Sequence, residues 1–195
     1  LINNAGAIYS NKELNSSGLE KTFTVNYLSH FFLTLSLIDL IKKTKNPRLL
    51  NISSWSHELA NLNLNDINFS KKYNGVMAYN NTKLMNILFT YKINRLYSNS
   101  INNYVIHPGW LNTNIANFNQ VAPRSLVKFA RFLFAKKPSY VADEIYSLCT
   151  NDKYLKVSGN YLVNNKVKKS SKSSYKEDLQ DKLWQISLEL TKQKI

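Results

Sequence analysis

Tyr79 and Lys83 are four residues apart and form the pair in this sequence whose types and spacing could do chemistry. On a helix, residues with this spacing lie on the same face, one turn apart. A free phenol has a pKa of about 10, and a nearby ammonium favours the phenolate and lowers that pKa. A tyrosine tuned in this way can donate or accept a proton near neutral pH. Taken alone, the pattern is more often a half-buried tyrosine beside a surface lysine.

The elements around this pair predict an α/β fold. Short apolar runs predict strands at residues 1–2, 48–52, 103–106 and 159–163. Amphipathic patterns predict helices at 19 to about 42, 78–98, 126–133, 139–148 and 179–190. Ser17 and Glu20 form a capping-box pattern before the first of these helices, and residues 55–76 and 166–172 are expected to be loops. Strands that alternate with helices imply a parallel sheet covered by helices on both faces.

Three polar or glycine-containing segments come directly after predicted strands. They are Asn4-Ala5-Gly6, Ser53-Ser54 and His107-Pro108-Gly109. Parallel sheets bind their ligands at the carboxyl ends of the strands. The order of the elements therefore predicts a ligand site built from these three segments, without reference to any family.

A longer series of motifs carries a family resemblance. Asn3-Asn4-Ala5-Gly6, Val25-Asn26-Tyr27-Leu28, Asn51-Ile52-Ser53-Ser54, Tyr79 to Asn86 and His107-Pro108-Gly109 follow one another in this order, and Tyr79 comes 25 residues after Ser54. Together they resemble the short-chain dehydrogenase/reductase family, and within it the retinol-dehydrogenase-like and WW-domain-oxidoreductase-like branch. The resemblance extends over the whole chain. It implies a single Rossmann-like, doubly wound NAD(P)-binding domain over residues 1–195.

The resemblance also implies roles for four catalytic residues. Tyr79 would be the general acid/base that acts on the substrate oxygen, and Lys83 would lower its pKa and bind the nicotinamide ribose. Ser54 would polarise the substrate carbonyl. Asn26 would hold a water that connects Lys83 to solvent. Ser53 is the alternative catalytic hydroxyl, but the spacing of 25 residues to the tyrosine favours Ser54.

The expected cofactor is NADP or NAD, with NADP favoured by the resemblance. Asn4-Ala5-Gly6 would line the adenine-ribose side, Pro108-Gly109 would pack against the nicotinamide ring, and Thr113 would bond its carboxamide or the pyrophosphate. His107 is expected to shape the strand end. His57 is expected to pack in its loop, although its closeness to Ser54 would also let it touch substrate.

One feature of the family is absent from the sequence. The five glycines at positions 6, 18, 75, 109 and 159 include no two that are close, so the phosphate-binding turn Thr-Gly-x-x-x-Gly-x-Gly is missing. We therefore expect a chain that lacks the first strands, a loss of roughly 75 to 90 residues at ~30 residues per unit. Such a chain would be nearly inactive by itself. The alternatives to an oxidoreductase are a catalytically inactive fragment or a non-catalytic binding protein that retains the fold.

The expected reaction is hydride transfer between NAD(P)(H) and a hydroxyl or carbonyl group. Aromatic residues in segment 110–137, the expected substrate-side flap, favour an apolar substrate such as a retinoid, steroid or lipid aldehyde. A protochlorophyllide reductase shares the Tyr/Lys pair, but Cys149 stands alone and no pigment-specific cysteine pattern exists. Basic residues in 124–137 suggest peripheral membrane contact of a cytoplasmic protein.

Composition narrows the classes of function. The net charge of +14 comes from scattered lysines without a nucleic-acid motif, so no nucleic-acid partner is expected, and the oligomeric state is left open. The single cysteine allows no disulfide within the chain. His30, His57 and His107 lack ligand spacing, so no metal site is expected. The longest apolar stretch, residues 31–41, is too short and too polar to span a bilayer.

Overall fold

The computed structural model describes residues 1–109 and 138–193. Thr113, the expected flap at 110–137, the expected helix at 126–133 and the basic segment 124–137 lie outside these residues. Within the described ranges, every strand expected from the sequence is present, with ends that differ by at most one residue.

The sheet has five strands in the order β1-β2-β3-β4-β5. Strands β1 to β4 are parallel to their neighbours, and β5 runs antiparallel to β4. The strands are β1 (Ile2–Asn3), β2 (Arg48–Ile52), β3 (Asn102–His107), β4 (Asn160–Val163) and β5 (Lys166–Lys168). One row of partners crosses the whole sheet: Asn3, Asn51, Val105, Tyr161 and Lys168. This register places the carboxyl ends of the parallel strands side by side.

Strand β5 corrects the expectation of a loop at residues 166–172. Its three residues are all exposed, so no apolar pattern marks it in the sequence. Asn164 and Asn165 both have positive φ, at 53° and 56°. That conformation suits a tight two-residue hairpin turn, and asparagine tolerates it better than most residues. This segment therefore pairs with β4 because of the turn at Asn164-Asn165, and not because it buries apolar side chains.

The first predicted helix is present but divided. It consists of α1 (Lys21–Phe23), a π-helical turn (Thr24–Leu28), α2 (Ser29–Ser36) and α3 (Ile38–Lys42). The capping-box prediction is wrong in detail, because Glu20 itself is the N-cap and its carboxylate accepts from the backbone N–H groups of Thr22 and Phe23. A carboxylate at a helix N-terminus satisfies free N–H groups and interacts well with the helix dipole.

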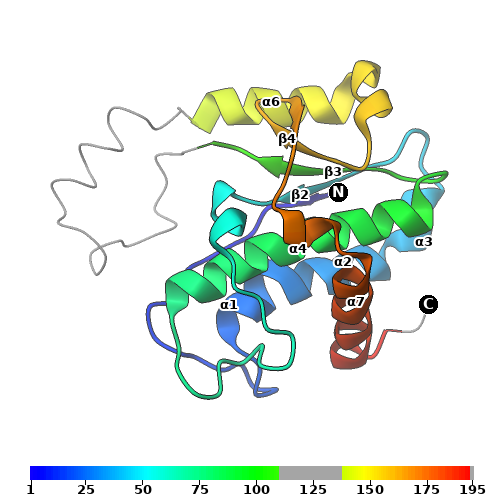
Figure 1. Ribbon diagram of the computed structural model, residues 1–195. Helices are drawn as coiled ribbons and strands as arrows, with labels where there is room; N and C mark the ends of the chain where they lie inside the picture. The colour runs from blue at the N-terminus through cyan, green and yellow to red at the C-terminus, as the bar shows by residue number, and fades with distance from the viewer. Residues whose placement is uncertain (110–137, 194–195) are drawn as a thin grey trace, which may run out of the picture.

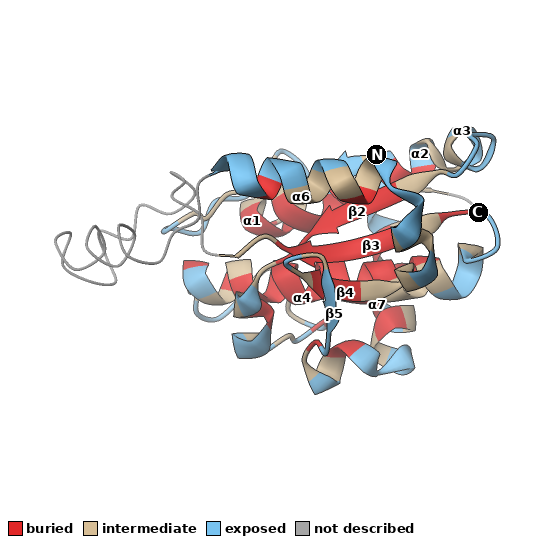
Figure 2. Ribbon diagram, turned by 90° about the horizontal axis from the view of Figure 1, so that it is seen from above, coloured by how far each residue is buried: buried red, intermediate tan, exposed pale blue. Residues whose placement is uncertain are grey.

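Helices cover both faces of the sheet, as the alternation of elements predicts (Figure 1). On one face, α4 (Gly75–Tyr97) lies against the strands and α7 (Glu177–Thr191) packs outside it. The rings of Phe31, Phe89 and Trp184 join α2, α4 and α7 with centroid separations of 5.1 to 6.1 Å. On the other face, Leu148 of α6 (Pro138–Thr150) packs on side chains of β2, β3 and β4. Figure 2 shows that the central strands β2 and β3 are mostly buried, whereas β5 is exposed.

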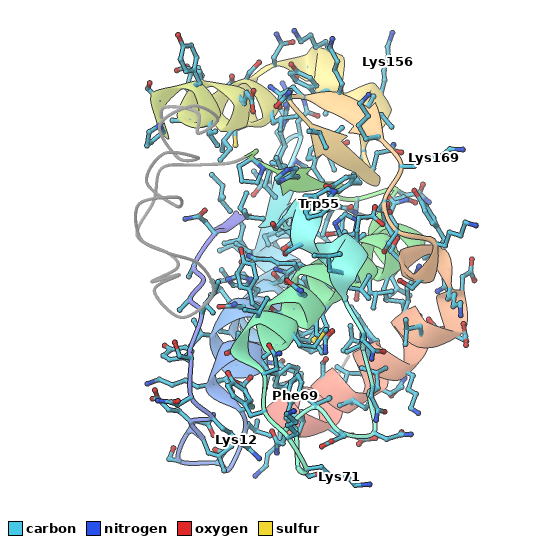
Figure 3. All side chains as sticks on the ribbon, turned by 60° about the vertical axis from the view of Figure 1, so that its left-hand side comes forward. Lys12, Trp55, Phe69, Lys71, Lys156 and Lys169 are labelled. Carbon is cyan, nitrogen blue, oxygen red and sulfur yellow. The ribbon has the colours of Figure 1, made fainter. Side chains whose placement is uncertain are left out.

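The remaining segments are short turns and loops. The expected loop 55–76 contains a 3-10 turn at Trp55–Leu59, and α4 begins at Gly75, three residues before the predicted start. Further 3-10 turns lie at Asp152–Val157 and Lys172–Tyr175. None of the helices in residues 1–109 and 138–193 is long and apolar enough to cross a membrane. The labelled Lys156 and Lys169 extend from the upper right of the molecule, and Lys12 and Lys71 extend from its lower end (Figure 3).

Gly75 allows a close approach that leads to a stability prediction. A Cβ added to Gly75 would lie 2.1 Å from the carbonyl oxygen of Tyr9, so backbone would have to move. Although alanine is the better helix former, we expect Gly75→Ala to lower the free energy of unfolding by about 1–3 kcal/mol. Urea denaturation would measure this loss. The matched control is Val76→Ala at the next, exposed position, expected to stay within about 0.5 kcal/mol of wild type. Equal stability of the two variants would contradict the prediction.

Candidate active site

Ser53 and Ser54 follow β2 and use their hydroxyls differently. The Ser53 hydroxyl is buried and donates to the carbonyl oxygen of Lys83 at 2.7 Å. The half-buried Ser54 hydroxyl accepts from the Ser56 N–H at 3.2 Å and lies close enough to the Tyr79 hydroxyl to lower the pKa of Tyr79. The structure therefore places Ser54, and not Ser53, beside the tyrosine, and the role of Ser54 as the catalytic hydroxyl stays a prediction.

Lys83 lies on the same face of α4 as Tyr79, with its Nζ 5.2 Å from the centre of the tyrosine ring. Its side chain is buried, and in the described part of the chain it donates one hydrogen bond, to the Ile52 carbonyl oxygen at 3.2 Å. No carboxylate among the described residues pairs with it, and burial lowers the pKa of Lys83 to about 8. A buried ammonium without an acid partner is costly, so the site is built to receive acceptor atoms.

The pKa of Tyr79 corrects an expectation from the sequence. Proximity to Lys83 was expected to lower it, but in this structure burial raises the pKa of Tyr79, and the hydrogen bond with Ser54 opposes that rise. Burial disfavours the phenolate, and the ammonium of Lys83 is directed to the Ile52 carbonyl instead of the phenol oxygen. The spacing of the two residues defines their shared face but not the sign of the shift.

Asn26 lies in the π-helical turn and is fully buried. Its carboxamide pairs with the backbone of Ala7, accepting from the N–H and donating to the carbonyl, both at 2.8 Å. The backbone carbonyl oxygen of Asn26 accepts a hydrogen bond from the side-chain amide of Asn86 at 3.2 Å. The same amide group of Asn86 donates to the backbone carbonyl of Ile52 at 3.1 Å. Asn26 and Lys83 are thus connected through Asn86 and Ile52. π-helical turns within helices are frequent at functional sites.

The segment after β1 lies over these residues. Asn4 and Ala5 are exposed, and a Cβ added to Gly6 would lie 3.5 Å from Asn26 Oδ1 and 3.6 Å from Lys83 Nζ. These are ordinary contact distances. The absence of a side chain at Gly6 therefore leaves open space directly beside the ammonium.

The end of β3 is adjacent to the end of β2, because the Ser53 N–H donates to the Ile106 carbonyl at 2.8 Å. Beyond it, the Gly109 N–H donates to His107 Nδ1 at 3.3 Å, and Gly109 has a φ of 87°. Glycine suits this left-handed conformation. Pro108 and Gly109 are half-buried, at the sheet edge where Ser54 lies.

Two buried residues at the site are not among those selected from the sequence. His30 lies one helical turn after Asn26, near the Ala5 backbone and the Asn86 side chain, and neither ring nitrogen makes a well-formed hydrogen bond to a described residue. Burial, followed by the charge of Lys83, lowers the pKa of His30 to about 4. Asn86 follows Lys83 by three residues. The i+4 and i+3 spacings from Asn26 and Lys83 are the signals that could have identified them.

The mainly parallel sheet with helices on both faces defines a Rossmann-like α/β protein with its candidate site at the strand ends. The chain belongs to the short-chain dehydrogenase family, whose family model, described as "short chain dehydrogenase", matches residues 1–122. It is 36% identical over 199 residues to human (Homo sapiens) polyprenol dehydrogenase, covering 98% of this chain and 60% of that protein. It is 34% identical over 191 residues to retinol dehydrogenase 14 of Mus musculus, covering 96% of this chain and 57% of that protein.

A solved structure of an uncharacterized protein from Mycobacterium paratuberculosis has a TM-score of 0.75 with this chain at 25% identity. The match covers 100% of this chain and 67% of that one. NADPH-bound carbonyl reductase from chicken fatty liver shares the fold, with a TM-score of 0.59 at 20% identity. The chain spans about 60% of the length of the curated relatives that it matches. What the names of these relatives state about substrates belongs to those proteins.

Proposed function

We propose that this protein is an NAD(P)-dependent oxidoreductase that interconverts an alcohol and a carbonyl group of an apolar substrate. The observation that carries the proposal is the Lys83 ammonium, which is buried without a carboxylate partner among the described residues, one turn from Tyr79. The Tyr79 hydroxyl in turn bonds Ser54. A hydroxyl pair beside a buried cation suits proton transfer to a substrate oxygen.

In this mechanism, the hydroxyl of Ser54 would donate a hydrogen bond to the substrate carbonyl oxygen and hold it beside Tyr79. Tyr79 would give its proton to that oxygen during reduction and take it back during oxidation. Lys83 would favour the ionised form of Tyr79 when its ammonium turns from the Ile52 carbonyl toward the site. Asn26 would keep segment 4–7 in place and hold a water that connects Lys83 to solvent, so that after reduction Lys83 could return a proton to Tyr79 and recover one from that water. The backbone carbonyl oxygen of Asn26, which accepts a hydrogen bond from Asn86, can accept a second one from this water.

The residues present fit the catalytic end of a nicotinamide dinucleotide. The free N–H groups of Lys83 suit ribose hydroxyls, the open space at Gly6 suits close backbone approach, and Pro108-Gly109 suits a flat ring. When bound, the dinucleotide would donate or accept the hydride. NADP is proposed over NAD on family resemblance. The sequence assigned Asn4-Ala5-Gly6 to the adenine-ribose side, but Gly6 lies beside Lys83 and is proposed for the nicotinamide-ribose end, so that only Asn4 and Ala5 would line the adenine-ribose side.

The proposed substrate is an apolar alcohol or aldehyde of the retinoid, steroid or lipid kind. Support comes from the relatives, which are named as polyprenol and retinol dehydrogenases. Both names denote long isoprenoid alcohols with one polar end. Such a molecule would place its hydroxyl at Ser54 and Tyr79.

The proposal is tested by adding NADPH or NADH to the purified protein with retinal, a polyprenal and a short aldehyde. Oxidation of the reduced cofactor, followed by absorbance with product identification, is the expected result, and it would show that the near-inactivity expected from the missing phosphate-binding turn is wrong. Cofactor binding without turnover of any substrate would support a non-catalytic binding protein. Absence of both binding and turnover would contradict the proposal.

Gly6→Ala provides a prediction specific to the cofactor site. The added methyl would meet ordinary contact distances, so we expect the thermal unfolding temperature to stay near that of wild type. It would, however, occupy space beside the Lys83 ammonium and weaken NADPH binding about tenfold, equivalent to about 1.4 kcal/mol. Isothermal titration calorimetry would measure the change. Unchanged affinity would show that the dinucleotide does not use this space.

A further inference from the structure

His57 is one of the most deeply buried polar residues near the site, with an exposed fraction of 1%. Its Nδ1 lies 2.6 Å from the carbonyl oxygen of Ser54, and its Nε2 lies 3.1 Å from the backbone nitrogen of Ser171. The ring also meets Tyr161 edge-on, with centroids 5.0 Å apart. His57 therefore connects the end of β2 to the segment that follows β5, 114 residues away.

These contacts determine which nitrogen carries the proton. The backbone N–H of Ser171 can only donate, so Nε2 must accept with its lone pair. The proton of the neutral ring is then on Nδ1, where it donates to the Ser54 carbonyl. This tautomer satisfies both nitrogens. The Glu58 carboxylate, 3.2 Å from Nε2, could accept a hydrogen bond only from a ring that carried a proton on Nε2.

The segment that holds His57 is itself tied to α4. The Ser170 hydroxyl shares a hydrogen bond of 2.7 Å with the Tyr91 hydroxyl, and Tyr91 lies on the helix that carries Tyr79. The Ser54 carbonyl accepts from both the ring and the backbone N–H of His57, the latter at 3.2 Å. The peptide after Ser54 is thereby held relative to α4, and the direction of the Ser54 side chain with it.

We propose that His57 is a positioning residue for Ser54, which holds the Ser54 hydroxyl at Tyr79 by donating from Nδ1 to the Ser54 carbonyl while Nε2 is anchored on Ser171. The role rests on the proposed function, because Ser54 matters as a catalytic hydroxyl there. Replacing a residue that holds a reacting group lowers the rate, because even a small misplacement of that group slows the reaction.

Two variants separate the two ends of the ring. The carboxamide nitrogen of His57→Asn can replace Nδ1 and keep the bond to Ser54, whereas the carboxamide of His57→Gln reaches the Nε2 position and keeps only the contact with Ser171. We expect His57→Asn to retain kcat close to wild type and His57→Gln to lose about ten- to hundredfold in kcat, with the KM for cofactor unchanged. His57→Phe, which keeps neither bond, should match His57→Gln. Equal losses in the Asn and Gln variants, in proportion to lost thermal stability, would overturn the proposal.

Two measurements need neither cofactor nor turnover. Long-range 15N NMR of the wild-type chain should show the proton of His57 on Nδ1, and a proton on Nε2 would overturn the proposal. The Ser54 bond lowers the pKa of Tyr79, so 13C NMR of labelled tyrosine should show a higher pKa in His57→Gln and an unchanged one in His57→Asn. An unchanged pKa in both variants would also overturn it. If the wild-type protein reduced no aldehyde, the proposed function would fail, whereas these spectra would still decide the role of His57.

Discussion

Tyr79→Phe is expected to lower the rate of aldehyde reduction by about 10²- to 10⁴-fold, the range for loss of a general acid. The substitution removes only the hydroxyl and keeps the aromatic ring that lies 5.2 Å from Lys83 Nζ. The hydrogen bond with Ser54 is lost, but the Ser54 hydroxyl is half-buried and can turn to water. Stability should therefore change by no more than about 1 kcal/mol. Stopped-flow or steady-state rates with retinal and NADPH would measure the effect.

The control for this variant is Tyr97→Phe, at the end of the same helix. Tyr97 is half-buried and contacts Lys42, far along α4 from the site. Removing its hydroxyl should leave the reduction rate unchanged. A Tyr79→Phe variant that kept the wild-type rate would show that another group supplies the proton, and the assignment of Tyr79 would be wrong.

Lys83→Met is expected to stabilise the folded chain at pH 7 while it removes cofactor binding. Burial lowers the pKa of Lys83 from 10.5 to about 8, so folding disfavours the charged form. That shift corresponds to about 3 kcal/mol. This value is an upper limit for the gain in stability when methionine, which has a similar shape, replaces a buried charge without an acid partner. Chemical denaturation at pH 7 would measure the gain.

The stabilisation by Lys83→Met should depend on pH, and the direction of this dependence follows from the lowered pKa of Lys83. Between pH 8 and 10.5, the unfolded chain holds the Lys83 proton and the folded chain releases it. The free energy of unfolding of the wild type should therefore rise across this window, relative to Lys83→Met, and the difference between them should shrink as pH rises. As a control, the stability of Lys92→Met, which removes a largely buried lysine paired with Asp181, would be measured over the same pH range. A constant difference between wild type and Lys83→Met would contradict the assigned pKa.

Local patterns in the sequence predicted most of the elements that position the site. Short apolar runs and period-3.6 patterns depend on a few neighbouring residues, so strands such as 48–52 and the helix that carries Tyr79 are visible without a structure. β5 was missed because its three residues are exposed and its pairing depends on the turn at Asn164-Asn165. The first helix was predicted as continuous, since the π-helical turn at Asn26 involves contacts with Ala7 and Asn86 that lie far away in the chain.

The candidate site divides in the same way. The sequence by itself determined that Tyr79 and Lys83 share a helical face, because residue spacing decides this. It also determined that Gly6 and Ser54 lie just after the carboxyl ends of parallel strands, because the order of the elements decides that. Only the tertiary structure decided that the Ser53 hydroxyl is occupied by the Lys83 carbonyl, that burial raises the pKa of Tyr79, and that His57 joins Ser54 to Ser171. These properties depend on burial and on hydrogen-bond partners up to 114 residues apart, and no local pattern encodes which distant atoms will meet.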